Sequence, residues 1–221
     1  MLSLEAFVQE HTVLGAAPLV PEIVLHLARD ADGIFGAGDT LPREIERFPP
    51  YWAFAWPGGQ ATARWLLDHR EAVAGKRVVD IGAGSGIAAI AAAMAGAAHV
   101  LAADVDPVAT AAIALNAGAN AVTVATTTTD ILGILPPADL VLIGDLVYDP
   151  ELATRVAALL ESAARQGVDV LFADRTSERR PPLAFDLLAE YAAPLTPPLA
   201  AHPFERARLW QLKRRLRKAG R

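Results

Sequence analysis

A glycine-rich turn stands out in the segment VVDIGAGSG, residues 78–86. An apolar stretch reaches Asp80, and the chain then passes Gly82, Gly84 and Gly86 before an alanine-rich segment that predicts a helix. Glycine is needed where the backbone takes a positive φ, or where a ligand approaches the main chain too closely for a Cβ atom. Ligands of open α/β sheets bind beyond the carboxyl ends of the strands. Because the spacing is G-x-G-x-G and not G-x-G-x-x-G, the turn predicts a ligand other than a dinucleotide.

Acidic side chains follow the next two predicted strands. Asp104 lies 22 residues after Gly82, where a carboxylate can accept hydrogen bonds from both hydroxyls of a ribose. Asp106 directly precedes Pro107 and is the better candidate for the N-cap of the following helix. Asp130 follows the third strand and could meet an adenine amino group, although an ordinary loop aspartate fits this position nearly as well.

A second motif, GDLVYD at residues 144–149, follows the fourth predicted strand. Asp145 and Tyr148 would place a carboxylate and a phenol at the same edge of the sheet as the glycine turn. A carboxylate can hold an incoming ammonium group, and a phenol can form a hydrogen bond beside it. Asp149 and Pro150 have a simpler explanation as the N-cap and first residue of a helix. That explanation does not cover Asp145.

Four aromatic residues crowd the segment YWAFAWPGGQ, residues 51–60. For any one of them, burial in the core is the ordinary explanation. Such a density directly before Pro-Gly-Gly is nevertheless unusual for packing alone. Gln60 and Trp65 are expected only to pack. The five histidines are scattered along the chain without ligand spacing, so no metal site is predicted.

Strand and helix patterns alternate from residue 76 onward. Apolar runs predict strands at 76–81, 99–103, 122–127, 139–143, 168–173 and 206–213, with a weaker one near Leu195. Helices are predicted at 62–73, 87–95, 107–117, 150–165 and 182–191. Before them, a short amphipathic helix (Leu2, Leu4, Phe7, Val8), a strand in PEIVLHLARD and a loop over 31–50 are expected. The alternation predicts an α/β fold: a parallel sheet with right-handed crossovers and helices on both faces.

The chain has 221 residues, 53% of them hydrophobic, and a net charge of −5. This length predicts one domain, with residues 1–50 as an extension covering the site and 76–213 as the core. The most apolar stretch, 87–101, is too short to span a membrane and no signal peptide is evident, so a cytoplasmic protein is expected. The absence of cysteine excludes disulfides, Cys-ligated zinc, iron–sulfur clusters and thiolate nucleophiles. The acidic balance argues against nucleic-acid binding, and the basic LKRRLRKAGR at the end is expected to be a solvated tail.

Taken together, these motifs resemble a known group of enzymes. DIGAGSG, the acidic end of the second strand and GDLVYD are similar to the motifs of class I S-adenosylmethionine-dependent methyltransferases. The pairing of WAFAWPGGQ with GDLVYD is more specific. With LLDH (66–69), DVDPVA (104–109) and LN (115–116), it resembles the electron transfer flavoprotein β-subunit lysine methyltransferase family from about Pro21 to the C-terminus.

The resemblance implies a Rossmann-like, doubly wound, mostly parallel seven-stranded sheet, S-adenosylmethionine as the cofactor, and methyl transfer to lysine ε-amines of a protein. It implies the electron transfer flavoprotein β subunit as that protein, and it places Trp56 and Gly58 at the methionine end of the cofactor. The catalytic candidates are Asp145 and Tyr148. The cofactor-binding candidates are Trp56, Gly58, Asp80, Gly82, Ala83, Gly84, Gly86, Asp104, Val105, Asp130 and Asp145. A monomer without nucleic-acid or membrane partners is expected.

Two alternatives remain open. The first is a methyltransferase acting on a ribosomal protein or a small molecule, although the ribosomal-protein enzymes usually show Asn-Pro-type chemistry after the fourth strand. The second is a non-catalytic nucleotide-binding module, which predicts G-x-G-x-x-G and a sheet of two halves. Methylation of a base at C5 would need a cysteine nucleophile. The excess of Asp and Glu is compatible with attraction of a lysine-bearing loop.

Overall fold

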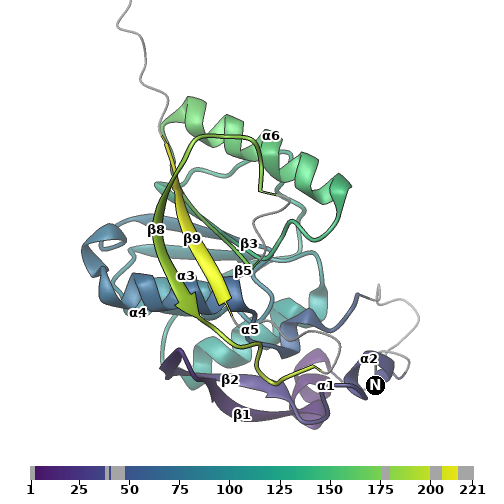
Figure 1. Ribbon diagram of the computed structural model, residues 1–221. Helices are drawn as coiled ribbons and strands as arrows, with labels where there is room; N and C mark the ends of the chain where they lie inside the picture. Colours follow the sequence, from purple (N-terminus) through teal and green to yellow (C-terminus); the bar gives the residue numbers. More distant parts are fainter. Residues whose placement is uncertain (1–2, 38–39, 41–47, 176–179, 200–205, 214–221) are drawn as a thin grey trace, which may run out of the picture.

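A seven-stranded sheet forms the centre of the protein (Figure 1). The computed structural model describes residues 3–37, 40, 48–175, 180–199 and 206–213. The strands lie in the order β5 (Ala125–Thr127), β4 (His99–Ala103), β3 (Arg77–Ile81), β6 (Leu140–Gly144), β7 (Asp169–Asp174), β9 (Arg206–Leu212) and β8 (Phe185–Ala192). The strands from β5 to β7 are parallel, and β9 runs antiparallel to both of its neighbours. The predicted α/β class with a mostly parallel sheet of seven strands is confirmed.

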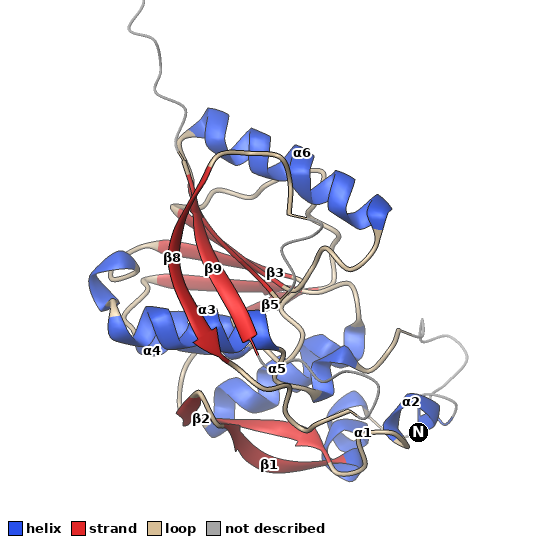
Figure 2. Cartoon of the chain, viewed as in Figure 1, coloured by secondary structure: helices blue, strands red, loops and turns tan. Residues whose placement is uncertain are grey.

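Helices cover the two faces of this sheet unequally (Figure 2). α6 (Pro150–Gln166) lies on one face, and the other face carries α3 (Pro57–Asp68), α4 (Ile87–Met94) and α5 (Pro107–Ala119). Neighbouring residues of β3 show the two-sided burial, because Val78 packs with the core under α3 and α4, whereas Val79 packs with Val156 and Leu160 of α6. Side chains alternate between the faces of a strand, so a strand covered on both faces is apolar throughout.

The N-terminal residues form a separate two-stranded sheet that packs on α5 (Figure 1). α1 (Leu4–His11) is followed by the antiparallel strands β1 (Thr12–Ala17) and β2 (Val20–Ala28). Asn116 of α5 accepts a hydrogen bond from the His26 N–H at 2.7 Å. The Asn120 amide pairs with both backbone polar groups of Val24, at 3.0 and 2.6 Å. These two amides therefore take the place of a third strand beside β2.

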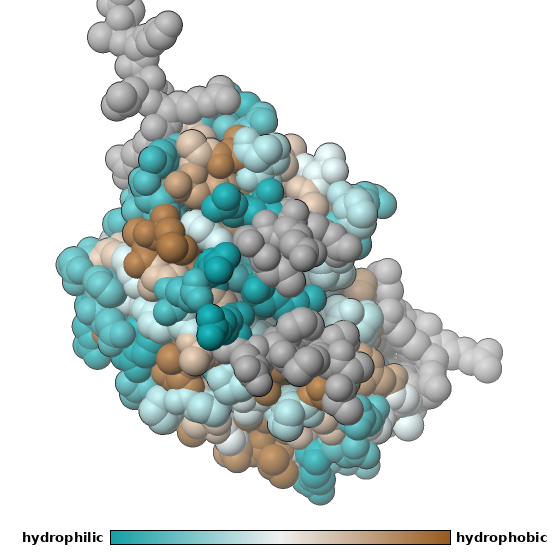
Figure 3. Space-filling model, viewed as in Figure 1, coloured by the Kyte–Doolittle hydropathy of each residue, from teal (hydrophilic) through white to brown (hydrophobic). Residues whose placement is uncertain are grey.

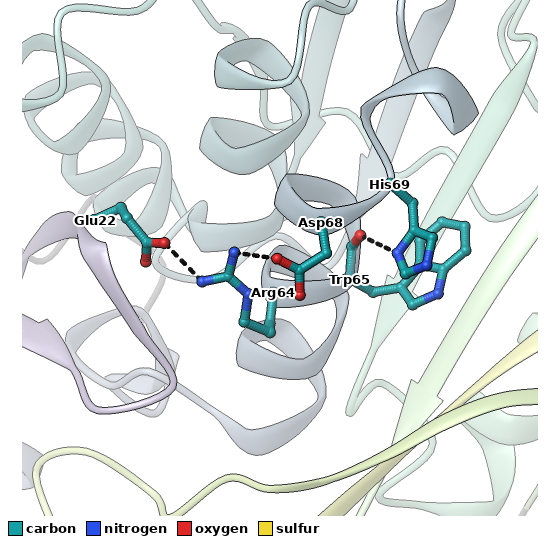
Figure 4. A network of polar contacts seen from close by, with 5 residues as sticks. All are labelled: Glu22, Arg64, Trp65, Asp68 and His69. Carbon is teal, nitrogen blue, oxygen red and sulfur yellow. Dashed lines mark hydrogen bonds and ion pairs between the residues drawn. The ribbon is translucent and has the colours of Figure 1, made fainter.

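An ionic network joins this small sheet to α3 (Figure 4). The Arg64 guanidinium donates to Glu22 of β2 at 2.7 Å and to Asp68, one turn further along α3, at 2.6 Å. At the end of α3, the ring of its C-cap residue His69 stacks on Trp65, with 4.5 Å between the ring centroids. Exposed ion pairs contribute little individually, but here a single guanidinium holds two elements together. The Arg64 guanidinium thus connects β2 to α3, and the first turn of α3 borders the site.

One predicted helix is wrong. Residues 182–191 were expected to be helical, because Leu, Ala and Glu favour helices, but the structure has β8 there. β8 pairs antiparallel with β9, and Phe185 packs on Phe172 of β7. Tertiary pairing therefore overrides the local helix propensity. The expected weaker strand near Leu195 is an isolated bridge between Ala55 and Thr196.

Other boundaries shift by several residues. The third strand begins at Ala125 and not at 122, while the helix expected over 62–73 begins at Pro57, ends at Asp68 and is followed by the 3-10 turn η3 (Arg70–Ala72). β1, α2 (Ile34–Ala37) and the 3-10 turn η2 (Tyr51–Ala53) were not anticipated. Leu2, most of the loop expected over 31–50 after residue 40, and residues 214–221 of the basic tail lie outside the described residues.

Apolar residues do not gather into one large patch on the face shown in Figure 3, where they form small groups among hydrophilic residues. Within the described residues, no helix combines the length and the apolar character that crossing a bilayer requires.

Candidate active site

A cavity of about 500 Å³ lies beyond the carboxyl ends of the parallel strands. Its wall comes from the segments that follow β3, β4, β5, β6 and β7, and from the residues before α3. This is the edge where ligands bind in open α/β sheets. The predicted site residues in the wall are Trp56, Gly82, Gly84, Asp104, Val105, Asp130, Asp145 and Tyr148. The predicted residues Gly58, Asp80, Ala83 and Gly86 are not among the residues that line it.

The glycine turn adopts the conformations that its sequence predicts. Gly82, Gly84 and Gly86 have φ values of +66°, +53° and +77°. A Cβ atom on Gly82 would come within 2.5 Å of the Leu146 side chain, and one on Gly86 would meet Ile113 at 3.0 Å. Gly86 contacts Ile113, and Ala83 packs against the core and accepts a hydrogen bond from the Gly86 N–H at 2.7 Å, while Gly82 and Gly84 line the cavity.

Asp80 lies at the end of β3 but is not brought to the cavity. Its buried carboxylate accepts a hydrogen bond from the Ala89 N–H of α4 at 3.1 Å, and burial raises its pKa to about 7. The alternation of side chains along β3 explains this position, since neighbouring residues of a strand face opposite sides. Asp80 thus anchors the helix that follows the glycine turn.

Asp104 reaches the cavity from the end of β4. Its Oδ2 accepts from the Gly84 N–H at 2.8 Å and its Oδ1 from the Asp106 N–H at 3.0 Å. Burial raises the pKa of Asp104. The two bonds hold the carboxylate beside the glycine turn. Asp106 caps α5 by accepting from the Val108 N–H, as its place before Pro107 predicts.

Asp130 lies in the cavity wall after β5 and is held by the opposite helix. Its carboxylate forms an ion pair with Arg155 of α6 and accepts from the Leu132 N–H at 3.1 Å. The Arg155 guanidinium lowers the pKa of Asp130. Val105, half exposed, completes this end of the wall.

Asp145, at the end of β6, has the most unusual environment in the site. It is a non-glycine residue at a φ of +52°, and its N–H donates to the Ala173 carbonyl. Oδ2 accepts from the Gly58 N–H at 2.5 Å, whereas Oδ1 is buried and has no hydrogen-bond partner among the described residues. Burial raises the pKa of Asp145 to about 7, and the nearby Asp174 adds to the rise. Such strain and an unsatisfied buried oxygen are typical of functional sites.

Aromatic rings surround the opening beside Asp145. The Tyr51 ring meets Trp56 at a centroid distance of 5.4 Å and Tyr148 at 5.7 Å, both edge to face. The Trp56 indole N–H donates to the Tyr51 carbonyl at 2.8 Å. Tyr148 remains 44% exposed, and partial burial raises its pKa. Asp149 is the N-cap of α6, as predicted, and accepts from the Glu151 and Leu152 N–H groups.

Comparison with known proteins identifies the relatives of this chain. The family model of the ribosomal protein L11 methyltransferases (PrmA) matches residues 60–168. The electron transfer flavoprotein β-subunit lysine methyltransferase of Xenopus laevis is 41% identical over 175 residues, which cover 76% of this chain and 69% of that protein. Its counterpart in Rattus norvegicus is 39% identical, over 78% of this chain and 68% of that protein. The chain belongs to the electron transfer flavoprotein β-subunit lysine methyltransferase family. It is an S-adenosylmethionine-dependent protein-lysine N-methyltransferase.

Solved methyltransferases share the fold of this lysine methyltransferase. The ribosomal protein L11 methylase of Lactobacillus delbrueckii subsp. bulgaricus aligns with a TM-score of 0.50 at 24% identity, covering 71% of this chain and 78% of that one. The Thermus thermophilus 16S rRNA N2 G1207 methyltransferase, solved with AdoMet and guanosine, aligns with a TM-score of 0.53 at 18% identity, covering 73% and 44%. These likenesses concern the fold alone.

The cavity of this lysine methyltransferase fits an adenosyl cofactor with an amino-acid end. Gly82 and Gly84 offer main chain without side chains. The Asp104 carboxylate lies beside them, and each of its oxygens can accept a further hydrogen bond. Beyond the glycine turn the cavity continues to Asp145, whose buried Oδ1 has no hydrogen-bond partner among the described residues.

Sequence reasoning missed two cations of the wall, Arg155 and Arg175. Arg175 directly follows β7, so the rule that locates ligands at strand ends points to it. Arg155 lies within α6, six residues after the Asp149 cap, and nothing in the sequence indicates that it reaches Asp130. Tyr51 was expected to be core, but it lines the cavity together with Phe48 and Pro49 of the N-terminal extension. That the extension covers the site stays a prediction.

Proposed function

We propose that this methyltransferase modifies lysine ε-amines of the electron transfer flavoprotein β subunit. The names of the Xenopus laevis and Rattus norvegicus relatives support the substrate. The buried Oδ1 of Asp145, which has no hydrogen-bond partner among the described residues, lies near the aromatic rings of Tyr51, Trp56 and Tyr148, and this observation supports an amine as the acceptor. A cytoplasmic location and a monomeric state without nucleic acid remain predictions.

The adenosine end of the cofactor is proposed to lie between β3 and β5. Asp104 would accept the ribose hydroxyls, and Asp130 the adenine amino group. Gly82, Gly84 and Val105 would line this part of the cofactor directly. Asp80, Ala83 and Gly86 support the turn from behind, and Gly58 supports Asp145. When bound, the cofactor supplies an activated methyl group on a sulfonium.

The acceptor lysine must lose a proton before it can react, because its amine has a pKa of about 10.4 in water and only the neutral form is a nucleophile. Asp145 attracts the ammonium form and accepts a hydrogen bond from it. The rings of Tyr51, Trp56 and Tyr148 exclude water, and desolvation lowers the pKa of an amine. The Tyr148 phenol forms a further hydrogen bond beside the methyl group. The ammonium releases its proton to solvent before the neutral amine attacks the methyl group and the sulfonium leaves as a neutral thioether. Neither Asp145 nor Tyr148 therefore has to be a strong base, since positioning and a dry site suffice for a direct displacement.

The test is incubation of the pure enzyme and labelled S-adenosylmethionine with purified electron transfer flavoprotein, followed by mass spectrometry. Label on lysines of the β subunit, lost with Asp145→Ala, supports the proposal. A parallel incubation with a cell extract identifies other acceptors, among them a ribosomal protein, which the family model over residues 60–168 favours as the second candidate. Label on a small metabolite, with none on a lysine, would refute the proposal.

A further inference from the structure

The strand order gives the cavity a direction. Reading along the rim, Asp130 follows β5, Asp104 follows β4, the glycine turn follows β3, Asp145 follows β6 and Arg175 follows β7. All five strand ends point to the same edge, since these strands are parallel. A ligand whose ribose and adenine lie at β4 and β5 therefore extends its other end over β3 toward β6 and β7.

Arg175 marks the far end of this path. Its guanidinium lies 5.6 Å from the centroid of the Trp56 ring, and its side chain lines the cavity. Its positive charge acts on Asp145, where it opposes the rise in pKa that burial causes. The end of the cavity opposite the adenosine site thus carries an arginine whose positive charge can attract an anion.

This positive charge complements the carboxylate in the head group of an α-amino acid. We propose that Arg175 binds the α-carboxylate of the cofactor's methionine end, an inference that rests on the proposed function. Arginine suits this task because its planar guanidinium matches a carboxylate with two parallel hydrogen bonds. Stacking on Trp56 holds the guanidinium in place before the ligand arrives.

The other arginine in the described part of the wall is a built-in comparison. Arg155 is also at the cavity, but it lies on α6 at the adenosine end and forms an ion pair with Asp130. Loss of Arg155 should weaken binding of any adenosine ligand, whereas loss of Arg175 should weaken only ligands that carry the carboxylate. The two variants therefore separate recognition of a carboxylate from a general effect of a lost charge.

The experiment is calorimetric titration of the full chain with S-adenosylmethionine and with its decarboxylated form, which differ only in the carboxylate. Wild type should bind the carboxylate form at least about tenfold more tightly, as expected for a charged hydrogen-bonded pair. Arg175→Gln should lose this preference through weaker binding of S-adenosylmethionine alone. Arg155→Gln should weaken both ligands by a common factor, and Arg175→Lys should retain part of the preference.

Three results would overturn the inference. Wild type could bind both ligands equally, or Arg175→Gln could keep the wild-type preference. In a third case Arg175→Gln keeps the preference for S-adenosylmethionine but has a higher KM for the protein substrate. Arg175 would then bind a carboxylate of the substrate protein. The affinity ratio is measured within one folded protein, and a melting curve of each variant verifies folding. If wild type binds neither ligand, the proposed function fails as well, which distinguishes the two failures.

Discussion

The Gly58 N–H donates a hydrogen bond of 2.5 Å to Oδ2 of Asp145, from the first turn of α3 to the end of β6. Gly58 is the second residue of a helix whose N-cap, Trp56, makes no side-chain capping bond. Asp145 supplies that missing acceptor at the positive end of the helix. One oxygen of the carboxylate is thus fixed by the fold, and the other has no hydrogen-bond partner among the described residues.

Replacing Gly58 by alanine should therefore impair catalysis while leaving the fold intact. A Cβ atom there would lie 2.7 Å from Asp145 Oδ2 and 3.0 Å from the Ala173 carbonyl, so the carboxylate has to move. We expect a loss of about 100-fold in kcat for lysine methylation, by the usual cost of a displaced acid–base group. Gly118→Ala is the matched control, since a Cβ atom on that helical glycine meets nothing within 4 Å. Wild-type kcat in Gly58→Ala would show that the position of Asp145 does not matter.

Methyl transfer should rise with pH through about 7. Burial raises the pKa of Asp145 to about 7, so its charged, ammonium-binding form is present above that value and is lost below it. This rising limb of the pH–rate profile should appear in kcat/KM, which reports the ionisation of groups in the free enzyme. Asp174 contributes to the raised pKa, so Asp174→Asn should move the limb to lower pH. A limb that stays in place, or shifts to higher pH, would assign the titration to another group.

The buried Asp80 should make the protein less stable as pH rises. Its pKa is about 7 in the folded state, against about 4 in an unfolded chain, so the folded protein holds the proton more tightly. The stabilisation present at low pH is lost as pH rises from about 4 to about 7. Asp80→Asn keeps an acceptor for the Ala89 N–H without the charge. Its melting temperature should fall less between pH 5 and pH 8 than that of wild type, and an equal fall would contradict this account.

Asn116 and Asn120 should differ in their effect on the cofactor. Both bind the backbone of β2, but Asn116 also donates to the Ser85 carbonyl of the glycine turn at 2.8 Å. Alanine at either position should reduce the free energy of unfolding by about 1–3 kcal/mol in a denaturant titration. Only Asn116→Ala should also weaken binding of S-adenosylmethionine, by several-fold in calorimetry. Equal affinities in the two variants would show that the small sheet does not influence the turn.

Local rules predicted much of this structure. The apolar runs located the parallel strands, and Asp106 and Asp149 cap helices because each precedes a proline in the first turn. The glycine turn and Asp145 reach the cavity because they end strands of one parallel sheet. These features depend on residues close to one another in the sequence.

Features that depend on distant partners escaped prediction. β8 is a strand because β9 pairs with it, although its own residues favour a helix. Asp80 faces α4 and not the cavity, which only the orientation of the whole strand decides. The bond from Gly58 to Asp145 joins residues 87 positions apart, and nothing near either residue indicates it.

The most direct test of the central claim is the comparison of wild type with Asp145→Ala in two measurements on the same samples: binding of S-adenosylmethionine, and transfer of labelled methyl to lysines of electron transfer flavoprotein. Because the free Oδ1 of Asp145 is assigned to the acceptor amine, the variant should bind the cofactor within a few-fold of wild type and lose transfer by about 100-fold or more. A variant that binds the cofactor normally and retains full transfer would contradict the role of Asp145.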